Sequence, residues 1–455
     1  MARKIVDPVI VIPGVTATYL RDEYPLPPEY VWKVLGFSKK YKRIALHPNN
    51  LKYEAKEPAR LQPGQLYEIA YEEIIEELRY NLSRTEDEPV PVYPFTFDWR
   101  MNLDQIEDQL GNFIEEVIDR TKLLTHYHLD GFDNSAKVNL VGHSMGGLII
   151  AGYLEKKGRK GEAAPVNKVV SLASPFQGSF ETIVKVTTGN ANFGMSAPSS
   201  REREAARLTP SLYHLLPSFK QGIEYHPDFP KSLFDPDVWQ PSITESLSEW
   251  IRLNGLPITG KTKKEREEKR RKFALELFGD LLQEANKHRQ RIDKLNLNDA
   301  GLTPDRWLAV VGVDAETRVH IEIIKRGKNP EFYFNADKDL KNNWGKKELP
   351  IQEQRQTGDG TVPFEGAIPK FLDLENLVCV TPDDYEFWEL KDKALTRIGG
   401  FHGILPNMNM LHRLIARFFK NAPDRRKNTW GRPAPGVDPD TEWDPPLKDL
   451  EPRKK

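Results

Sequence analysis

The sequence predicts an α/β fold in which a mostly parallel central sheet is flanked by helices. Five short apolar runs, rich in β-branched residues, each end at a turn-forming or polar residue, which is typical of buried strands. Amphipathic stretches with helical spacing alternate with some of these runs. This alternation is the pattern of a parallel sheet that is covered on both faces.

The expected elements follow from these runs in chain order. The strands are predicted at Val9–Ile12, 137–141, 168–172, 307–313 and 377–380. An amphipathic helix is predicted over 103–124, because apolar residues recur there at helical spacing. The pattern over 409–419 predicts a terminal helix for the same reason.

The length of 455 residues allows about three domains of about 150 residues, or one large domain with insertions. Residues 1–180 and 301–420 are expected to form the two parts of one α/β core. Residues 181–300 separate two expected strands by more chain than a crossover helix needs, which predicts an inserted helical cap or lid. Residues 421–455 are rich in Pro and charge, and we expect a flexible tail that Trp430 and Trp443 could pack on the surface.

Composition excludes several classes of function. There are 66 Lys and Arg against 67 Asp and Glu, so the net charge of −1 provides no overall field that would attract nucleic acid. The single Cys379 cannot form an internal disulfide or a multi-thiolate metal cluster. The mean hydropathy is −0.59, and no apolar run approaches the roughly 20 residues that span a bilayer. The N-terminal apolar stretch is broken by Asp7 and Pro8, so it is expected to be a strand and not a signal peptide.

A candidate nucleophile lies in Gly142-His143-Ser144-Met145-Gly146, directly after an expected strand and before a helix-like stretch. This is the context of a nucleophile elbow, a strained turn that lifts the Ser144 hydroxyl away from the sheet. Small residues are needed at 142 and 146 because a Cβ there would collide with the neighbouring strand or helix. The motif in this context predicts Ser144 as a catalytic serine.

A serine nucleophile needs a base to accept its proton and a carboxylate to orient that base. In the chain order Ser, acid, His, the Gly-flanked Asp359 is the predicted acid, and Asp314 after the 307–313 strand is the alternative. His402 is the predicted base, because it lies in a Gly-rich segment, expected to be a mobile loop, before the terminal helix.

Three further histidines are possible competitors for the role of base. His412 falls inside the pattern of the terminal helix and is expected to pack there. His143 is expected to belong to the packing of the elbow, because the residue next to the nucleophile points elsewhere. His320 follows Asp314 but precedes Asp359, so it is compatible only with the alternative acid.

The tetrahedral intermediate of acyl transfer needs two backbone donors for its oxyanion. The amide of Met145, directly after the nucleophile, is the first predicted donor. The second is predicted at Val15, with Thr16 as the next choice, because Gly14 lets that loop approach closely. The alternative is that Pro13-Gly14 is only a turn that ends the strand.

Taken together, these motifs resemble the lecithin:cholesterol acyltransferase-like family of α/β-hydrolases, with a more distant likeness to lipases. The resemblance extends over about residues 5–420 and is carried by Val9–Gly14, Pro94–Arg100, Gly142–Gly147, Ser174–Gly178, Gly358–Val362 and His402. It implies an α/β-hydrolase fold, a lid before the triad acid, and a substrate with a fatty-acyl ester. Secreted members carry a signal peptide and a lid disulfide, and neither is expected here, so extracellular lipoprotein-like substrates are not expected.

The expected function is therefore a serine esterase that acts on lipid acyl esters, with phospholipid as the specific guess and water or an alcohol as acyl acceptor. The enzymatic alternative is the same triad acting on a small soluble ester, a lipid-anchor ester or an amide. A non-catalytic module that binds lipid or protein through the cap is the alternative of another class. The mechanism requires no metal or other cofactor, and no nucleotide-binding motif is present. The expected location is the cytoplasm, with peripheral contact at membranes for a lipid substrate.

Two further segments are candidates for binding lipid or a partner. Lys261–Lys272 carries eight basic and three acidic residues, and it is either a solvated helix face or a patch for anionic lipid or a partner. Tyr24–Phe37 stands where members of the resembled family place an aromatic lid. It is expected either to contact lipid there or to pack against the sheet edge.

Overall fold

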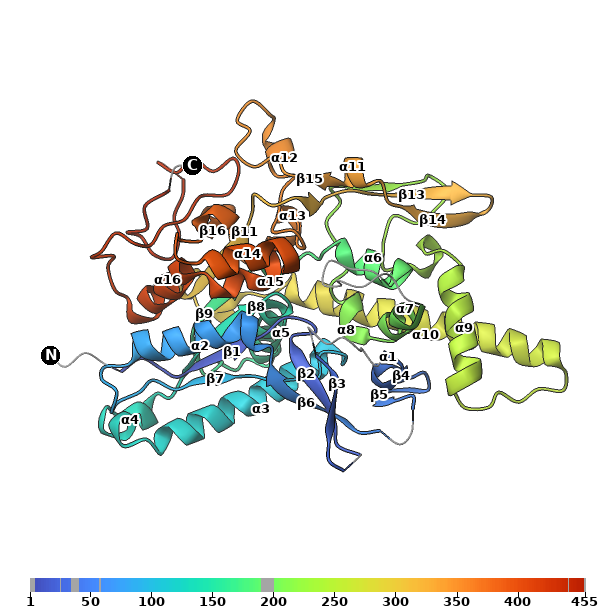
Figure 1. Cartoon of the computed structure of the whole chain (residues 1–455), viewed down its shortest axis with the longest axis horizontal. Helices are drawn as coiled ribbons and strands as arrows, with labels where there is room; N and C mark the ends of the chain where they lie inside the picture. Colours follow the sequence, from blue (N-terminus) through green and yellow to red (C-terminus); the bar gives the residue numbers. More distant parts are fainter. Residues whose placement is uncertain are drawn as a thin grey trace.

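A parallel sheet of six strands forms the centre of the protein, in the order β16-β11-β9-β8-β1-β7 (Figure 1). The computed structural model describes residues 5–24, 26–33, 41–56, 59–189, 200–440 and 442–453. The strands are β1 (Val9–Ile12), β7 (Val92–Pro94), β8 (Val138–His143), β9 (Val166–Leu172), β11 (Trp307–Gly312) and β16 (Leu377–Val380). The predicted α/β class and its parallel sheet are confirmed. The short edge strand β7 is an addition that the sequence analysis did not predict.

Helices cover both faces of this sheet, and strand β1 shows how its side chains are divided between them. Ile10 and Ile12 pack into the core that contains α3 (Leu103–Lys122) and α5 (Met145–Arg159). Val9 and Val11 pack into a second core with α2 (Glu68–Leu82) and α16 (Asn409–Lys420). A strand that buries both of its faces must be apolar at every position, which explains the continuous Val-Ile-Val-Ile run.

The chain between β9 and β11 forms a largely helical region, seen at the right of Figure 1. It contains α6 (Glu181–Thr188), α7 (Ser200–Arg207), α8 (Pro210–Tyr213), β10 (Ile223–Tyr225), α9 (Ser242–Asn254) and α10 (Lys263–Ile292); residues 190–199 of the expected cap lie outside the described residues. A second excursion follows β11, with the hairpin β13 (Ile321–Arg326) and β14 (Asn329–Tyr333). Strand β10 pairs with β13, so these two stretches of chain share one small sheet.

The basic segment Lys261–Lys272 forms the exposed start of α10. The Thr262 side chain accepts a hydrogen bond from the backbone N–H of Glu265 and caps the helix. Ion pairs four residues apart follow, such as Lys269–Glu265 and Arg271–Glu267. These contacts are typical of a solvated helix face.

The C-terminal segment packs along the edge of the sheet. The backbones of Cys379 in β16 and Arg432 exchange hydrogen bonds of 2.8 and 3.1 Å, so this segment covers the open edge of the strand. Trp443 Nε1 donates to Leu377 O, and Trp430 Nε1 donates to Asp384 Oδ1. Packing through both tryptophans agrees with the sequence analysis, whereas the described part of the segment is held by these bonds and is not a loose tail.

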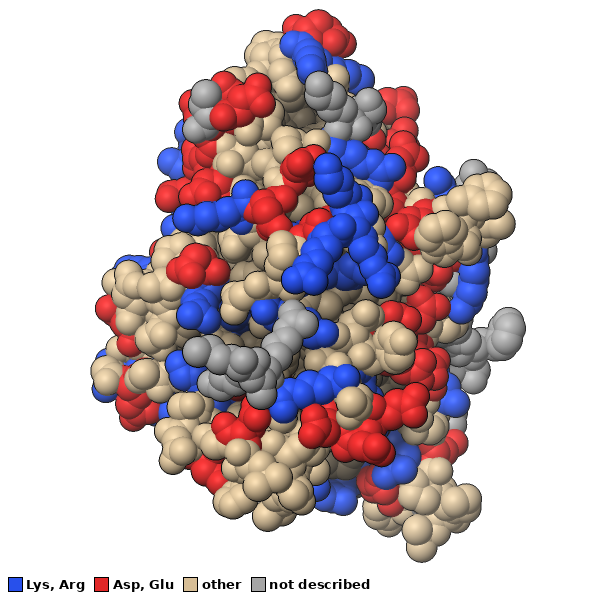
Figure 2. All heavy atoms as spheres, turned by 90° about the vertical axis from the view of Figure 1, so that its left-hand side faces the viewer, with Lys and Arg blue, Asp and Glu red and all other residues tan. Residues whose placement is uncertain are grey.

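None of the helices in the described ranges is long and apolar enough to cross a membrane. On the face at the left of Figure 1, acidic and basic side chains are interspersed, with one small group of Lys and Arg near the centre (Figure 2). This mixture agrees with the near-zero net charge of the chain.

Candidate active site

Ser144 occupies a strained turn between β8 and α5. Its backbone has φ 53° and ψ −125°, a conformation that side-chain-bearing residues rarely adopt. The Ser144 backbone N–H donates to Leu172 O at 2.9 Å, which anchors the turn to the neighbouring strand β9. Because α5 begins at Met145, the turn places the Ser144 side chain beside the N-terminus of a helix.

Close packing around this turn requires glycine. A Cβ at Gly146 would lie 2.3 Å from the backbone O of Ile12, and one at Gly142 would lie 2.8 Å from the backbone of Gly146. A Cβ at Gly14 would lie 2.9 Å from the Ser144 Cβ, so the loop after β1 also approaches the serine closely. These distances are too short for any other residue without movement of the backbone.

The structure brings Ser144, His402 and Asp359 together. His402 Nε2 lies 2.9 Å from Ser144 Oγ, and His402 Nδ1 lies 2.6 Å from Asp359 Oδ2. All three side chains are buried. The arrangement assigns the proton of the neutral imidazole to Nδ1, where it is donated to the carboxylate, and leaves Nε2 to accept the serine hydroxyl proton.

Backbone donors fix the Asp359 carboxylate. The N–H groups of Thr361 and Val362 donate to Asp359 Oδ1 at 2.9 and 2.7 Å, so the other oxygen faces His402. His402 in turn donates its own backbone N–H to Asp359 O at 3.0 Å. The turn from Asp359 to Thr361 depends on Gly360, which has φ 92°.

His402 lies in a short helix, and the expectation of a loop at this position is therefore wrong. α14 (Leu390–Gly399) leads through Gly400, at φ 79°, into α15 (Phe401–Ile404), and His402 is the second residue of α15. The Leu405 N–H donates to Phe401 O within this turn, and the His402 backbone is held by Asp359 and His143, contacts that the local sequence does not reveal.

The residues considered as alternatives for the acid and the base make contacts outside the Ser144–His402–Asp359 group. Asp314, with φ 68°, accepts a hydrogen bond from Asn342 Nδ2 at 3.1 Å. His412 is buried in α16, as expected, and its Nε2 donates to Pro406 O at 2.7 Å; burial lowers its pKa to about 4. His320 lies between Glu224 and Asp339 in the second excursion.

Val15 and Met145, the predicted oxyanion donors, both lie beside the serine. Val15 and Thr16 line the same pocket as Ser144 and His402, and Thr16 has φ 65° in the tight loop after β1. Met145 is the first residue of α5, and the N–H groups of a first helical turn have no partner within the helix. Backbone donors at such a position attract negative charge. Their catalytic role stays a prediction.

The pocket around Ser144 has walls of two kinds. Apolar side chains include Val15, Trp32, Leu212, Leu215 and Val362. The other part is polar, with Ser179, Glu181, Thr182, Lys185 and Glu202. Within it, Lys185 forms an ion pair with Glu202, and Glu181 accepts a hydrogen bond from Arg318 Nε at 3.2 Å.

Trp32 is the part of the expected aromatic lid that reaches this pocket. It ends β3 (Glu29–Trp32), and its Nε1 donates to Thr16 O at 3.0 Å. Its ring lies 5.1 Å from that of Trp99, so it is packed against the core instead of facing solvent. Pro25 and residues 34–37 of the predicted Tyr24–Phe37 lid lie outside the described residues.

Tyr71 of α2 is a site residue that the sequence analysis missed. The backbone N–H of Gly14 donates to Tyr71 Oη at 3.0 Å, and Tyr71 Oη lies 2.6 Å from His143 Nδ1. His143 Nε2 then lies 2.9 Å from His402 O. Nothing in the local pattern of α2 marks this tyrosine, because its partners are brought to it only by the fold.

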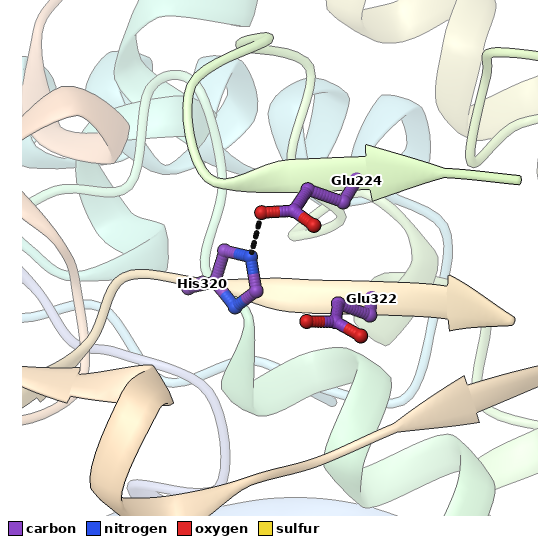
Figure 3. A group of neighbouring side chains, drawn as sticks. All are labelled: Glu224, His320 and Glu322. Carbon is purple, nitrogen blue, oxygen red and sulfur yellow. Dashed lines mark hydrogen bonds and ion pairs between the residues drawn. The ribbon is translucent and has the colours of Figure 1, made fainter.

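A separate group of Glu224, His320 and Glu322 has the donor types of a metal site (Figure 3). Glu224 of β10 and Glu322 of β13 are paired in the small sheet, and His320 Nε2 lies 2.9 Å from Glu224 Oε1. Lys338 forms ion pairs with both carboxylates. Because this ammonium group already forms ion pairs with both carboxylates, we assign no metal to the cluster, which lies outside the pocket of Ser144.

Comparisons with known proteins show which family and which solved structures this chain resembles. Residues 60–240 match the family described as lecithin:cholesterol acyltransferase. A chain in the crystal structure of the Tle4–Tli4 complex covers 91% of this chain and 98% of its own length, with 13% sequence identity and a TM-score of 0.56. The structure of the lin2722 gene products from Listeria innocua covers 51% of this chain and 74% of its own, at 15% identity and a TM-score of 0.19, too low to support an argument.

None of the curated proteins matches the sequence. The family match supports, in general terms, an enzyme that hydrolyses or transfers the acyl groups of lipid esters. The fold, the elbow around Ser144 and the match over residues 60–240 show that the chain is an α/β-hydrolase that resembles the lecithin:cholesterol acyltransferase family.

Proposed function

We propose that the protein is a serine hydrolase that cleaves fatty-acyl esters of lipids through a covalent acyl-enzyme. The observation that carries the proposal is the position of His402, whose two ring nitrogens lie 2.9 Å from Ser144 Oγ and 2.6 Å from Asp359 Oδ2. This is the geometry that nucleophilic catalysis by a serine requires. The lipid part of the proposal is supported by the family match.

In the proposed reaction Ser144 Oγ attacks the ester carbonyl carbon while His402 Nε2 accepts the hydroxyl proton. The carboxylate of Asp359 holds Nδ1–H and stabilises the imidazolium that forms. The carbonyl oxygen becomes an oxyanion, to which the amides of Val15 and Met145 are proposed to donate.

Collapse of the tetrahedral intermediate breaks the bond to the alcohol, which leaves with the proton from His402. The acyl group stays on Ser144. His402 then activates water, or an acceptor alcohol, which releases the acyl group and restores the serine hydroxyl. Hydrolysis and acyl transfer differ only in this last acceptor.

Residues 181–300, whose described part is largely helical, are proposed to act as a lid over this site. Residues from it, such as Leu212 and Leu215, line the pocket together with Ser144. If it opens at a lipid surface, the rate on a dispersed ester should rise when the substrate forms an interface. A rate proportional to substrate concentration across that threshold would contradict the lid.

The first experiment compares fatty-acid release from phospholipid vesicles and from a short-chain soluble ester, each with the wild type and Ser144→Ala. Release from vesicles that disappears in Ser144→Ala would support a lipase with this nucleophile. Cleavage of the short ester alone would indicate that the substrates are small acyl compounds. A series of acyl chain lengths would then show which length the pocket accepts. If the folded wild type cleaves neither ester and a fluorophosphonate leaves Ser144 unlabelled, the catalytic proposal is wrong and a binding module remains.

A further inference from the structure

Three large apolar side chains are exposed where the segment after β16 enters α14. Phe387 is 85% exposed, Trp388 70% and Leu390 62%. Single exposed apolar residues are common on protein surfaces, but three within four positions form a local apolar patch. We call Phe387, Trp388 and Leu390 the apolar tip.

Within residues 386–394 the exposed charges are of one sign, whereas Asp383 before this stretch is exposed and Glu73 of α2 lies near Lys391. The other exposed residues of 386–394 are Lys391, Lys393 and Ala394. The acidic residues of the same stretch are turned inward and have partners: Glu386 pairs with Arg413, Glu389 accepts the backbone N–H of Asn409, and Asp392 accepts from Asn407 Nδ2. The segment therefore presents apolar and positively charged groups to solvent.

A packed base supports the apolar tip. Tyr385, two residues before Phe387, is buried, and its Oη donates to Ile404 O at 2.7 Å. The Tyr385 ring also lies 6.2 Å from that of Phe401, in an edge-on arrangement. Because Phe401 and Ile404 are the two ends of α15, the base of the tip contacts the helix that carries His402.

The topology places the apolar tip on the side of the sheet where Ser144 lies. β16 and β8 belong to one parallel sheet, so their carboxyl ends are at the same edge. Ser144 follows the end of β8, and the segment that leads to the tip follows the end of β16.

We propose that the apolar tip inserts into the interfacial region of a membrane that contains anionic lipid, with Lys391 and Lys393 beside the headgroups. Aromatic side chains favour this interface, and lysines near it gain from negatively charged lipids. Lys391 and Lys393 are exposed within seven residues of Phe387, and the carboxylates between 386 and 394 are not, which favours a negatively charged surface as the occupant. The proposal rests on the proposed function only in choosing a lipid surface over a protein partner.

The test measures binding to sucrose-loaded vesicles of phosphatidylcholine with phosphatidylglycerol, and to vesicles of phosphatidylcholine alone. The variants are Phe387→Ser with Trp388→Ser, and Lys391→Gln with Lys393→Gln. The matched control is Leu123→Ser with Leu129→Ser. These leucines are 84% and 80% exposed beside α4 (Thr125–Leu129), whose Tyr127 contacts Val6 near the start of β1, at the opposite edge of the sheet.

We expect the wild type and the Leu123/Leu129 control to bind anionic vesicles equally. The Phe387/Trp388 variant should bind about tenfold or more weakly, and the lysine variant about tenfold more weakly on anionic vesicles only. Wild-type binding that is unchanged by the Phe387/Trp388 substitutions, or absent from both kinds of vesicle, would overturn the proposal.

Activity on a short soluble ester separates this proposal from the proposed function. The tip variants should keep the wild-type rate on that ester, because they lie outside the pocket. Ser144→Ala should bind vesicles as the wild type does while it releases no fatty acid. Binding by the tip without any esterase activity would overturn the proposed function but not the membrane contact. Esterase activity without vesicle binding would overturn the membrane contact but not the esterase activity.

Discussion

His143 Nε2 lies 2.9 Å from the backbone oxygen of His402, the residue that joins Ser144 to Asp359. The pKa of His143 is held well below its usual value by burial and by the nearby imidazole of His402, so His143 is neutral at pH 7. Because Gly14 N–H donates to Tyr71 Oη, the tyrosine can donate its own proton to His143 Nδ1. His143 Nε2–H then donates to His402 O, and the loop before Val15 is connected to α15.

Tyr71→Phe is expected to lower kcat/KM about tenfold to 100-fold, because it removes the contact that holds both the Gly14 loop and His143 in place. Tyr71 touches no reacting atom, so it is a positioning residue. A short-chain ester assay with kcat and KM measured separately checks this: the decrease should fall mainly on kcat.

Tyr127→Phe is the matched control for this variant. Tyr127 is also buried, and its Oη donates one hydrogen bond, to Val6 O at 2.7 Å, near the opposite edge of the sheet. Both variants should lose about 1 kcal/mol of unfolding free energy, but only Tyr71→Phe should lose activity. Equal activities in the two variants would show that the Tyr71 contact has only a structural role.

Asp359→Asn is expected to reduce kcat about 10⁴-fold while the protein stays folded, because an amide in this place favours the wrong tautomer of His402. Asp314→Asn should stay close to the wild type, since its side chain accepts from Asn342 and the asparagine side chain retains an acceptor oxygen at this position. Single-turnover kinetics on a chromogenic ester and far-ultraviolet circular dichroism measure the two effects. A loss confined to Asp314→Asn would move the role of acid to Asp314.

Gly146→Ala is expected to destabilise the protein by about 3 kcal/mol, because the new Cβ would lie 2.3 Å from the carbonyl oxygen of Ile12 in the neighbouring strand. The control is Gly279→Ala inside α10, where the nearest atom to a new Cβ is Pro236 Cγ at 3.7 Å. That change should stabilise the helix by up to about 1 kcal/mol. Urea unfolding of both variants tests whether the close approach in the elbow has this consequence.

The strands of the central sheet could be predicted from the sequence because burial on both faces leaves a continuous apolar run. β1 coincides with the expected Val9–Ile12, and β16 with 377–380. β7 was missed because it has only three residues, ends in Pro94 and is not fully buried. The β10–β13 pairing joins Ile223 to Ile321 across nearly one hundred residues, and no local pattern predicts such a partner.

For the site, chain order and motif context were enough to name Ser144, Asp359 and His402. The structure places His402 within hydrogen-bonding distance of both Ser144 and Asp359. Local patterns failed where tertiary contacts decide the structure. The Gly-Gly pair before Phe401 predicted a loop, yet Gly400 serves as the turn into α15. Tyr71 has no motif of its own, because its role depends on Gly14 and His143 from other elements.

Buried neutral histidines should make the protein lose stability as the pH falls. His412 is buried, its pKa is lowered to about 4 chiefly by burial, and its Nδ1 has no hydrogen-bond partner among the described residues. The unfolded chain, with a histidine pKa of about 6.5, binds a proton between pH 6.5 and 4 that the folded chain does not bind. The contribution of neutral His412 to the free energy of unfolding is therefore fully present above about pH 6.5. It falls by about 2 kcal/mol by about pH 5.

His412→Gln tests this contribution, because glutamine is neutral at every pH and can still donate to the Pro406 carbonyl. We expect its free energy of unfolding to fall about 2 kcal/mol less than that of the wild type between about pH 7 and pH 5. His128→Gln, at an exposed histidine of α4, is the control and should follow the wild type. Burial also lowers the pKa values of His143, His214 and His288, so the His412 variant should retain a reduced pH dependence. A wild-type slope in His412→Gln, measured by urea unfolding, would show that this imidazole is protonated equally in both states.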